Sequence, residues 1–146
     1  MVIRNFLLVS LLLTGCASQA PFPETANRPQ QVISMAAEAA PQSVVATVTM
    51  QVQAVGNQQG ITYLNSESDY RDQRNISIAI SPAARIKVEA IFGGELSKVA
   101  TGKRILVNGS AKRVTIWFFD NNGKRSDKYY YQTQIFVSDP AQIHII

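Results

Sequence analysis

Cysteine and histidine each occur once in this chain of 146 residues, as Cys16 and His144. A single cysteine cannot form an internal disulfide, and a single histidine excludes both a catalytic triad and a zinc site built from several histidines. No Gly-x-Gly-x-x-Gly loop for phosphate binding is present. His144 lies between two isoleucines near the end, where a surface position on a last strand is expected. We therefore expect no cofactor, no metal and no enzymatic activity.

The first residues combine a positive charge with a short apolar run. Arg4 precedes Phe6–Leu13, which is too short to span a bilayer, since a transmembrane helix needs about 20 apolar residues. This pattern is typical of an export signal rather than of a fold element. An ordinary secretory signal followed by an incidental cysteine is one interpretation of the segment.

The end of this segment reads Leu13-Thr14-Gly15-Cys16, which resembles the lipobox of bacterial lipoproteins. The resemblance implies that residues 1–15 are a signal peptide and that Cys16 becomes the first residue of the mature chain and carries lipid. Lipid at Cys16 would hold the protein at a membrane, because each buried methylene contributes about 0.8 kcal/mol. Ala17 stands where an aspartate favours inner-membrane retention in such lipoproteins. The resemblance thus implies an outer-membrane location facing the periplasm.

A flexible linker is expected between the lipid and a folded domain. Residues 16–42 contain four of the six prolines and are rich in alanine and glutamine. This composition buries too little apolar surface to offset the ordering of the backbone. A short helix over Val32–Ala40 fits the Ala, Met and Glu residues there, but nine residues are marginal without packing. A segment that binds a partner is the alternative interpretation.

Beyond the linker, apolar residues alternate with polar ones, which is the side-chain period of a β-strand. A helix is expected after the third strand, because Ser81-Pro82 is a typical helix start and Gly93-Gly94 a typical end. We expect Ile86, Ala90 and Phe92 to face inward on this helix. The predicted strands cover residues 44–54, 61–64, 75–80, 105–119 and 129–137, and residues 142–146 close the chain.

The longest predicted strand has Gly109 in its middle. A glycine inside a strand marks a bulge, a bend or a close approach of the backbone, and a small barrel needs bent strands. Five strands with a helix between the third and fourth favour the five-stranded Greek-key barrel called the OB-fold. We therefore predict a mainly β chain with a signal peptide at 1–15, a lipid-anchored linker at 16–42 and an OB-fold-like domain at 43–146.

Three segments of the predicted barrel carry a further pattern: Tyr63-Leu64-Asn65, Gly102-Lys103-Arg104-Ile105 with Val107-x-Gly109, and Ile135-Phe136-Val137-Ser138-Asp139-Pro140-Ala141-Gln142-Ile143. Together they resemble one group of OB-fold domains. In that group the last segment runs as a strand, an Asp-Pro turn and a Gln-Ile pair that packs against the barrel. Members are nucleic-acid-binding modules or domains of unknown role, so the resemblance implies a fold more than a ligand.

The candidate binding surface combines cations with aromatic rings. OB-folds bind single strands or oligosaccharides on the face of strands two and three, where rings stack on bases and cations follow phosphates. Anionic lipids or polyanionic glycans fit the same charge, and an envelope location argues against nucleic acid. Alternatively, about half of the rings fill the core and the charges are solvated. The residues expected at this surface are Lys103, Arg104, Lys112, Arg113, Trp117, Tyr130, Arg71 and Arg74.

The polar segment over residues 65–74 is the second candidate site. Its carboxylates are of the kind that hold a hard cation or share acid–base work. Arginines are interleaved with them, which favours a salt-bridged, ordered loop that Tyr70 pins to the barrel. The charged residues of this segment are Glu67, Asp69, Arg71, Asp72 and Arg74.

These patterns favour a lipid-anchored envelope protein whose domain is a non-catalytic binding or adaptor module for a polymeric ligand or a protein partner. A structural component of an envelope assembly is the alternative, with exposed strand edges as its docking surface. An enzyme would have to use the carboxylates of Asp69 and Asp72. Membrane lipid attached through Cys16 is the one partner that the sequence itself predicts.

Overall fold

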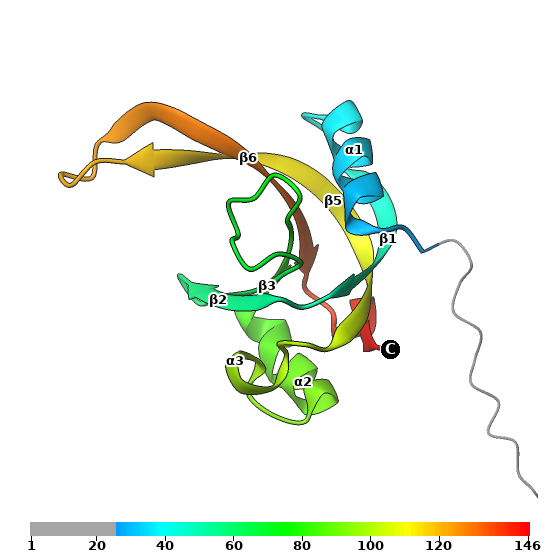
Figure 1. The fold of residues 1–146 in the computed structure, drawn as a ribbon. Coiled ribbons are helices and arrows are strands. Elements are labelled where there is room, and N and C mark those ends of the chain that lie inside the picture. The colour runs from blue at the N-terminus through cyan, green and yellow to red at the C-terminus, as the bar shows by residue number, and fades with distance from the viewer. Residues whose placement is uncertain (1–25) are drawn as a thin grey trace, which may run out of the picture.

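The computed structural model describes residues 26–146, so the predicted signal peptide, Cys16 and Ala17 lie outside the described residues. Strands predominate in this part, as Figure 1 shows. The elements in chain order are α1 (Pro29–Ala39), β1 (Val44–Gln51), β2 (Ala54–Gln58), β3 (Ile61–Asn65), β4 (Ile76–Ile80), α2 (Pro82–Phe92), α3 (Leu96–Val99), β5 (Arg104–Phe119), β6 (Arg125–Val137), the 3₁₀ turn η1 (Pro140–Gln142) and β7 (Ile143–Ile145).

The strands follow one another in the sheet as β1-β5-β6-β4-β3-β2, and β4 pairs with β6 in parallel while the other neighbours are antiparallel. The two ends of this order, β1 and β2, are halves of one bent strand. At the bend, Val52 N–H donates to Lys103 O on the β5 side, and Gln53 N–H donates to Asn65 O on the β3 side. The sheet thereby forms a five-stranded Greek-key barrel with a helix after its third strand. The predicted mainly β, OB-fold architecture is confirmed.

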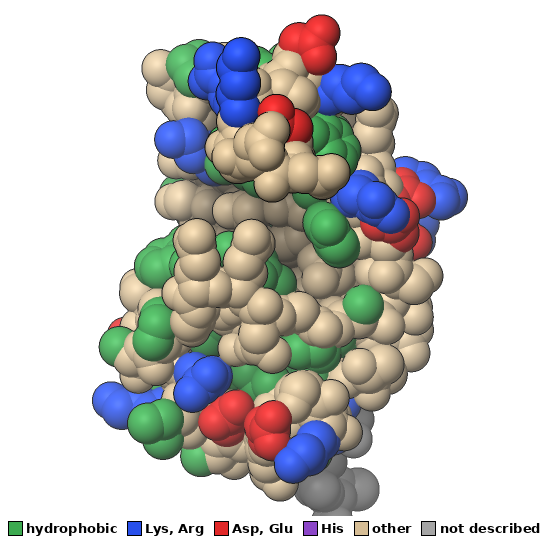
Figure 2. Space-filling view, turned by 90° about the vertical axis from the view of Figure 1, so that its left-hand side faces the viewer, with side chains coloured by type: hydrophobic (Ala, Val, Ile, Leu, Met, Phe, Trp, Pro, Cys, Tyr) green, Lys and Arg blue, Asp and Glu red, His purple; other side chains and the backbone are tan. Residues whose placement is uncertain are grey.

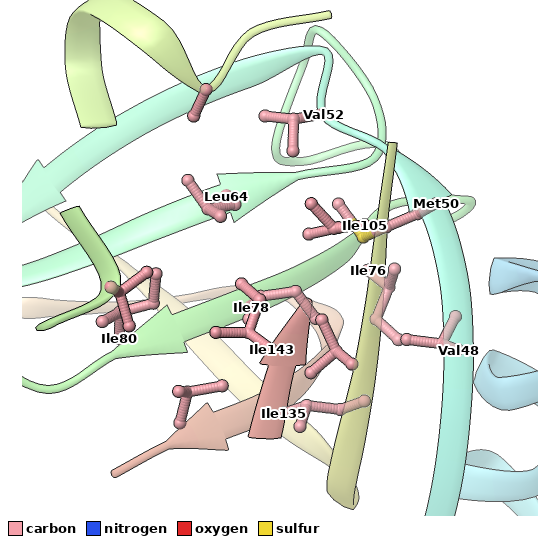
Figure 3. Close-up of a cluster of buried hydrophobic side chains, with 14 of the residues drawn as sticks. Val48, Met50, Val52, Leu64, Ile76, Ile78, Ile80, Ile105, Ile135 and Ile143 are labelled. Carbon is pink, nitrogen blue, oxygen red and sulfur yellow. The ribbon is translucent and has the colours of Figure 1, made fainter. Parts of the chain in front are cut away.

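The barrel core is built from aliphatic side chains that come from β1, β3, β4, β5, β6 and β7, many of which Figure 3 shows. β1 contributes Val48 and Met50 at alternate positions, as a half-exposed strand should. β4 is buried along its whole length, with Ile76, Ile78 and Ile80 facing the interior. Each fully buried aliphatic side chain stabilises the fold by about 1.5–3 kcal/mol.

Helix α2 has the predicted ends but presents a different face. The Ser81 hydroxyl accepts from Ala84 N–H at 3.2 Å, and Gly93 ends the helix in the left-handed conformation with φ 80°. Ala84, Val88 and Phe92 are buried, whereas Ile86 is 73% exposed. The prediction that Ile86 and Ala90 face inward is therefore wrong, and only its third residue, Phe92, is correct. The buried stripe has i, i+4 spacing, and small Ala84 made it hard to recognise.

Helix α1 corrects the predicted boundary between linker and domain. Val32 and Ala36, one turn apart, are fully buried in the core cluster, and the helix packs against β1 and β5. Just before it, Asn27 N–H donates to Thr47 O at 2.8 Å and Asn27 O accepts from Thr49 N–H at 3.0 Å. The linker predicted over residues 16–42 therefore does not extend beyond residue 26. Average composition concealed the short apolar stripe, and packing supplies the stability that nine isolated residues lack.

Gly109 lies where another strand and a side chain approach the backbone closely. A Cβ at this position would lie 2.7 Å from Ile135 Cγ2 and 3.1 Å from Gln142 Nε2. The Gln142 carboxamide donates to Asn108 O and Phe136 O and accepts from Ser138 N–H, so it ties β5, β6 and η1 together. Of the three features that a glycine at position 109 could mark, the structure shows the close backbone approach, and the Gln142-Ile143 pair packs against the barrel as the resemblance implied.

Replacing Gly109 with alanine is expected to destabilise the domain by about 2 kcal/mol. The new methyl group would overlap Ile135, which is fully buried and cannot move without disturbing the core. Urea unfolding followed by circular dichroism measures the change. Gly56→Ala serves as the control, because a Cβ there meets nothing within 4 Å. Equal losses for both variants would contradict the packing explanation.

Candidate binding cleft

The hairpin of β5 and β6 extends beyond the barrel as a two-stranded arm (Figure 1). β1 pairs with β5 only over residues 104–111, and β4 pairs with β6 only over residues 133–137. Beyond these residues the two long strands pair only with each other, within the described part of the chain. The predicted Asn-Gly turn lies at the tip, where the Asp120 carboxylate accepts from Asn122 N–H and Lys124 N–H. We call residues 112–132 the arm.

A cleft of about 330 Å³ lies between the arm, the outer face of the barrel and the β2–β3 hairpin. Figure 2 shows the molecule hollowed below the arm, with mainly uncharged polar surface in the hollow. The eleven lining residues include no charged side chain. They are Gly56, Asn57, Gln58, Tyr63, Asn65, Tyr70, Ser77, Ile116, Tyr130, Gln132 and Gln134.

The cleft occupies the face on which OB-folds bind chain-like ligands. Tyr63 and Asn65 point outward from β3, the second strand of the barrel, because the intervening Leu64 points into the core. Ser77 points outward from β4, the third strand, by the same alternation. The β2–β3 turn and the arm flank this face, in the places where OB-folds carry their ligand-binding loops.

A buried polar network forms the floor of the cleft and is centred on Asn75. The Asn75 carboxamide donates to Asn65 Oδ1 at 3.1 Å and to Ser77 Oγ at 2.9 Å, and it accepts from Glu67 N–H at 3.1 Å. Ser77 Oγ donates to Asn65 Oδ1 at 2.7 Å. Every fully buried polar side-chain atom of residues 26–146 has a hydrogen-bond partner, and the buried atoms of this network are among them.

The same network holds the loop over residues 66–75 against the barrel. Tyr70 O accepts from Asn75 Nδ2 at 3.3 Å and from Gln132 Nε2 at 3.0 Å. The Tyr70 carbonyl is thereby bonded both to the end of its own loop, directly before β4, and to β6, which fixes Tyr70 at the rim of the cleft. The expectation that Tyr70 packs on the barrel is met through its backbone, while its ring remains 53% exposed.

The carboxylates of this loop are paired with its arginines, as the salt-bridged interpretation predicted. Arg71 Nε lies 3.1 Å from Asp69 Oδ1, and Arg74 Nη2 lies 2.7 Å from Asp72 Oδ2. The hydrogen bonds from Arg74 lower the pKa of the Asp72 carboxyl to about 2, and those from Arg71 lower the pKa of Asp69. Within residues 26–146 no cluster of acidic, His or Cys side chains is arranged to hold a metal ion.

The Asp72–Arg74 pair is expected to persist in mild acid. Because its pKa is about 2 in the fold against the usual 3.8, Asp72 contributes its stabilisation above pH 4 and loses it as the pH falls towards 2. Carboxyl NMR titration should give a midpoint near 2 for Asp72. Arg74→Gln should move this midpoint up towards 3.8, and Arg71→Gln should leave it unchanged. An unshifted midpoint in the parent chain would contradict the pairing.

Three tyrosines from three elements surround the cleft: Tyr63 of β3, Tyr70 of the loop and Tyr130 of the arm. Partial burial raises the pKa of the Tyr130 hydroxyl above its usual value, and the nearby Tyr70 adds to the shift. Tyr130 therefore remains a hydrogen-bond donor at neutral pH. The rings offer apolar faces with polar tips, a combination well suited to a ligand that is partly apolar and partly hydroxylated.

The opposite face of the arm carries a row of rings with a cation at each end. Trp117 and Tyr129 lie with ring centroids 5.1 Å apart, and Tyr129 and Tyr131 lie 5.5 Å apart. Arg125 Cζ lies 4.5 Å above the Trp117 ring, and Arg113 Cζ lies 4.4 Å from the Tyr131 ring centre. These contacts use two cations to stabilise the arm itself, at about 0.5–1 kcal/mol each.

The surface predicted from sequence is therefore divided among several places. Of its residues, Tyr130 lines the cleft, while Trp117 and Arg113 belong to the opposite face of the arm. Lys103 and Arg104 lie at the start of β5, at the other end of that strand from Trp117. Lys112 is exposed at the base of the arm, and Arg71 and Arg74 are paired within the loop. The structure does not bring the predicted cations together.

Sequence reasoning missed most of the cleft, including Asn65, Gln132 and Gln134 as lining residues. Gln132 and Gln134 alternate along β6 with apolar positions such as Ile135 and Val137 that face the core. That alternation was a usable signal for a polar outer face. His144 is exposed on β7, as expected.

No family model matches the chain, and no curated protein matches it. Solved structures give distant matches. One is a protein from Leishmania major Friedlin assigned as an aspartyl-tRNA synthetase, at TM-score 0.45 and 10% identity, covering 88% of this chain and 22% of the other. Another is an aspartyl-tRNA synthetase from Entamoeba histolytica, at TM-score 0.40 and 13% identity, covering 75% of this chain and 20% of the other. The chain thus spans about a fifth of each.

None of the helices in residues 26–146 has the length and apolar character needed to cross a membrane.

Proposed function

We propose that this protein is a lipid-anchored, non-catalytic binding module of a bacterial cell envelope, which holds an extended polymer in the cleft below the arm. The observation that carries the proposal is the cleft itself, on the outer face of the second and third barrel strands. Its eleven lining residues contain no carboxylate, imidazole, thiol or amine. Such a lining favours recognition over acid–base or nucleophilic chemistry.

The short distance along the chain between Cys16 and the domain supports a role close to the membrane. Asn27 is already hydrogen-bonded to β1, so about ten residues separate the proposed lipid from the barrel. Ten residues span at most about 35 Å when fully extended. The cleft would therefore work on material next to the membrane surface, and the outer membrane, facing the periplasm, is the location that Ala17 favours.

A structural role within an envelope assembly is the second candidate, and the arm favours it. Residues 112–119 of β5 and 125–132 of β6 pair only with each other among the described strands, so their outer edges carry backbone groups available to another strand. Phe119 at the tip is 64% exposed. A protein partner could add a strand to either edge.

Two experiments on the full-length chain in bacterial cells test the proposal. Labelling with radioactive palmitate should mark the parent chain and fail in Cys16→Ser, and label retained in that variant would exclude lipid at Cys16. A photo-crosslinking residue placed at Gln58, which lines the cleft and is exposed, should give an adduct with envelope material. The same residue at Ser34, exposed on α1, is the control. Equal adducts at both positions would exclude the cleft as the binding site.

A further inference from the structure

We propose that the polymer held in the cleft is an uncharged glycan, a chain of neutral sugar units. The inference rests on the proposed function, because it names the ligand class of that same cleft. It differs from the expectation of a polyanionic ligand that the basic sequence suggested.

The charge of the cleft is the first argument. Nucleic acids and acidic glycans carry repeated negative charges, and proteins bind them through cations that approach those charges. No lysine or arginine lines the cleft. The nearest arginine along the chain to a lining residue, Arg71, forms two hydrogen bonds with Asp69, both at 3.1 Å. A charged polymer in this cleft would have to break that pair or lie without a counter-charge.

The hydrogen-bonding groups of the cleft are the second argument. Five of the lining residues are Asn or Gln, and a carboxamide carries both donors and acceptors. Some of these groups are already bonded within the protein: Gln132 Nε2 donates to Tyr70 O, Gln134 Nε2 donates to Gln132 Oε1, and Asn57 Oδ1 accepts from Thr62 Oγ1. The remaining donors and acceptors of the set face the cleft. A sugar hydroxyl also donates and accepts, so a carboxamide can satisfy it in either direction, whereas a phosphate oxygen only accepts. A row of carboxamides therefore matches a hydroxylated chain better than a phosphodiester chain.

Asn65 provides a group in the cleft that has no protein partner. Its side chain is held from one side, since Asn65 Oδ1 accepts from both Asn75 Nδ2 and Ser77 Oγ. These two bonds fix which end of the carboxamide faces the network. Within residues 26–146 no hydrogen bond is donated by Asn65 Nδ2, and since every fully buried side-chain nitrogen there has a partner, this group is accessible from the cleft although Asn65 as a whole is only 4% exposed. A rigid, nearly buried donor at the floor of a cleft is suited to a ligand oxygen.

The three tyrosines are the third argument. Sugar rings have apolar C–H faces as well as hydroxyl edges, so they pack on an aromatic ring while their hydroxyls bond to polar groups nearby. Tyr63, Tyr70 and Tyr130 border the same cleft whose floor carries the carboxamides. The cleft volume of about 330 Å³ is at the small end for ligand sites, which fits a short stretch of a longer chain.

Calorimetric titration of the full chain in detergent micelles tests the inference. The probes are cellohexaose and hexa-N-acetylchitohexaose as neutral sugar chains, an oligogalacturonate as an acidic one, and a thymidine oligomer as a nucleic acid. At least one neutral sugar chain should bind, and the two anionic probes should bind more weakly. Tyr130→Leu should weaken the neutral binding about fivefold, since a lost ring contact is worth about 1 kcal/mol.

Tyr131→Leu is the matched control, because Tyr131 is the next residue of β6 and lies on the opposite face of the arm. The affinity of Tyr131→Leu for the neutral sugar chain should remain within about twofold of that of the parent chain. If circular dichroism shows that Tyr130→Leu is unfolded, Tyr63→Leu on β3 serves as a second cleft variant. It should weaken binding of the neutral sugar chain by the same factor.

Tighter binding of the thymidine oligomer or of the oligogalacturonate would overturn the inference but leave a polymer-binding cleft. Equal losses in Tyr130→Leu and Tyr131→Leu would also overturn it, since the ligand would then not lie in the cleft. Failure of both neutral sugar chains to bind at millimolar concentration would overturn it as well. In that case the crosslink at Gln58 decides whether the proposed function survives.

Discussion

Asn75→Leu is expected to lower the free energy of unfolding by about 3 kcal/mol. The Asn75 side chain is 1% exposed and bonds to groups from β3, β4 and the loop over residues 66–75. Leucine has the same branching at Cγ, is larger and has no polar atoms, so the loss comes from hydrogen bonds and crowding rather than from a cavity. Each buried group left without a partner costs about 1–3 kcal/mol. Glu67 N–H is one such group, because its bond to Asn75 joins the start of the loop to its end.

Chemical denaturation followed by circular dichroism measures this loss, and amide hydrogen exchange shows where it arises. We expect faster exchange at Glu67, because its amide donates to Asn75. We also expect Tyr70 to shift at the rim of the cleft, because its carbonyl oxygen accepts from the Asn75 side chain. Gln73→Leu is the control, since Gln73 is exposed in the same loop and should change stability by less than about 0.5 kcal/mol. Similar stability of Asn75→Leu and the parent chain would show that the network does not hold the loop.

Val32→Asp, a substitution in helix α1, is expected to lower the free energy of unfolding by a comparable amount, about 3–4 kcal/mol. Val32 is fully buried in the core cluster between α1 and the barrel. The substitution removes apolar burial worth about 1.5–3 kcal/mol and places a carboxylate among apolar side chains. Helix α1 can then stay on the barrel only with this carboxyl group protonated, and otherwise it leaves the barrel.

The readout for Val32→Asp combines denaturation with limited digestion by a glutamate-specific protease at Glu38 of α1. In the parent chain α1 should protect this site, because the segment from Asn27 onward is bonded to β1 and packed on the barrel. In Val32→Asp cleavage should become fast. Ser34→Asp introduces the same charge on the exposed face of α1 and should leave both stability and cleavage nearly unchanged. Fast cleavage in the parent chain would instead support the linker over residues 16–42 that composition predicted.

The two variants also bear differently on the cleft. Asn75→Leu acts on its floor and on the loop that carries Tyr70, so ligand binding should fall with stability. Val32 lies on no lining element, since the cleft is formed by β2, β3, β4, the loop and the arm. Loss of α1 packing should instead lengthen the chain between Cys16 and the barrel and leave the cleft formed, provided that the barrel itself remains folded.

The sequence by itself determined the strands, the position of the helix after β4 and the turn at the arm tip. These features depend on side-chain alternation, on Ser81 and Gly93 at the helix ends, and on the Asn122-Gly123 pair, all of which act over a few residues. The close approach at Gly109 also followed from the sequence, because glycine weakens a strand interior unless the backbone there must bend or touch a neighbour. The lipobox-like Leu13–Cys16 segment remains a sequence prediction.

Tertiary structure alone decided which side chains share a site. Arg104 and Trp117 lie on one strand in sequence, yet the first stands beside β1 and the second on the arm, so the predicted cations and rings separate. The cleft joins Asn65 and Tyr70 to Gln132, which lies 62 residues beyond Tyr70 in the chain, because β4 pairs with β3 on one side and β6 on the other. Likewise, α1 is stable because Val32 and Ala36 find the barrel core, a contact that no local pattern specifies.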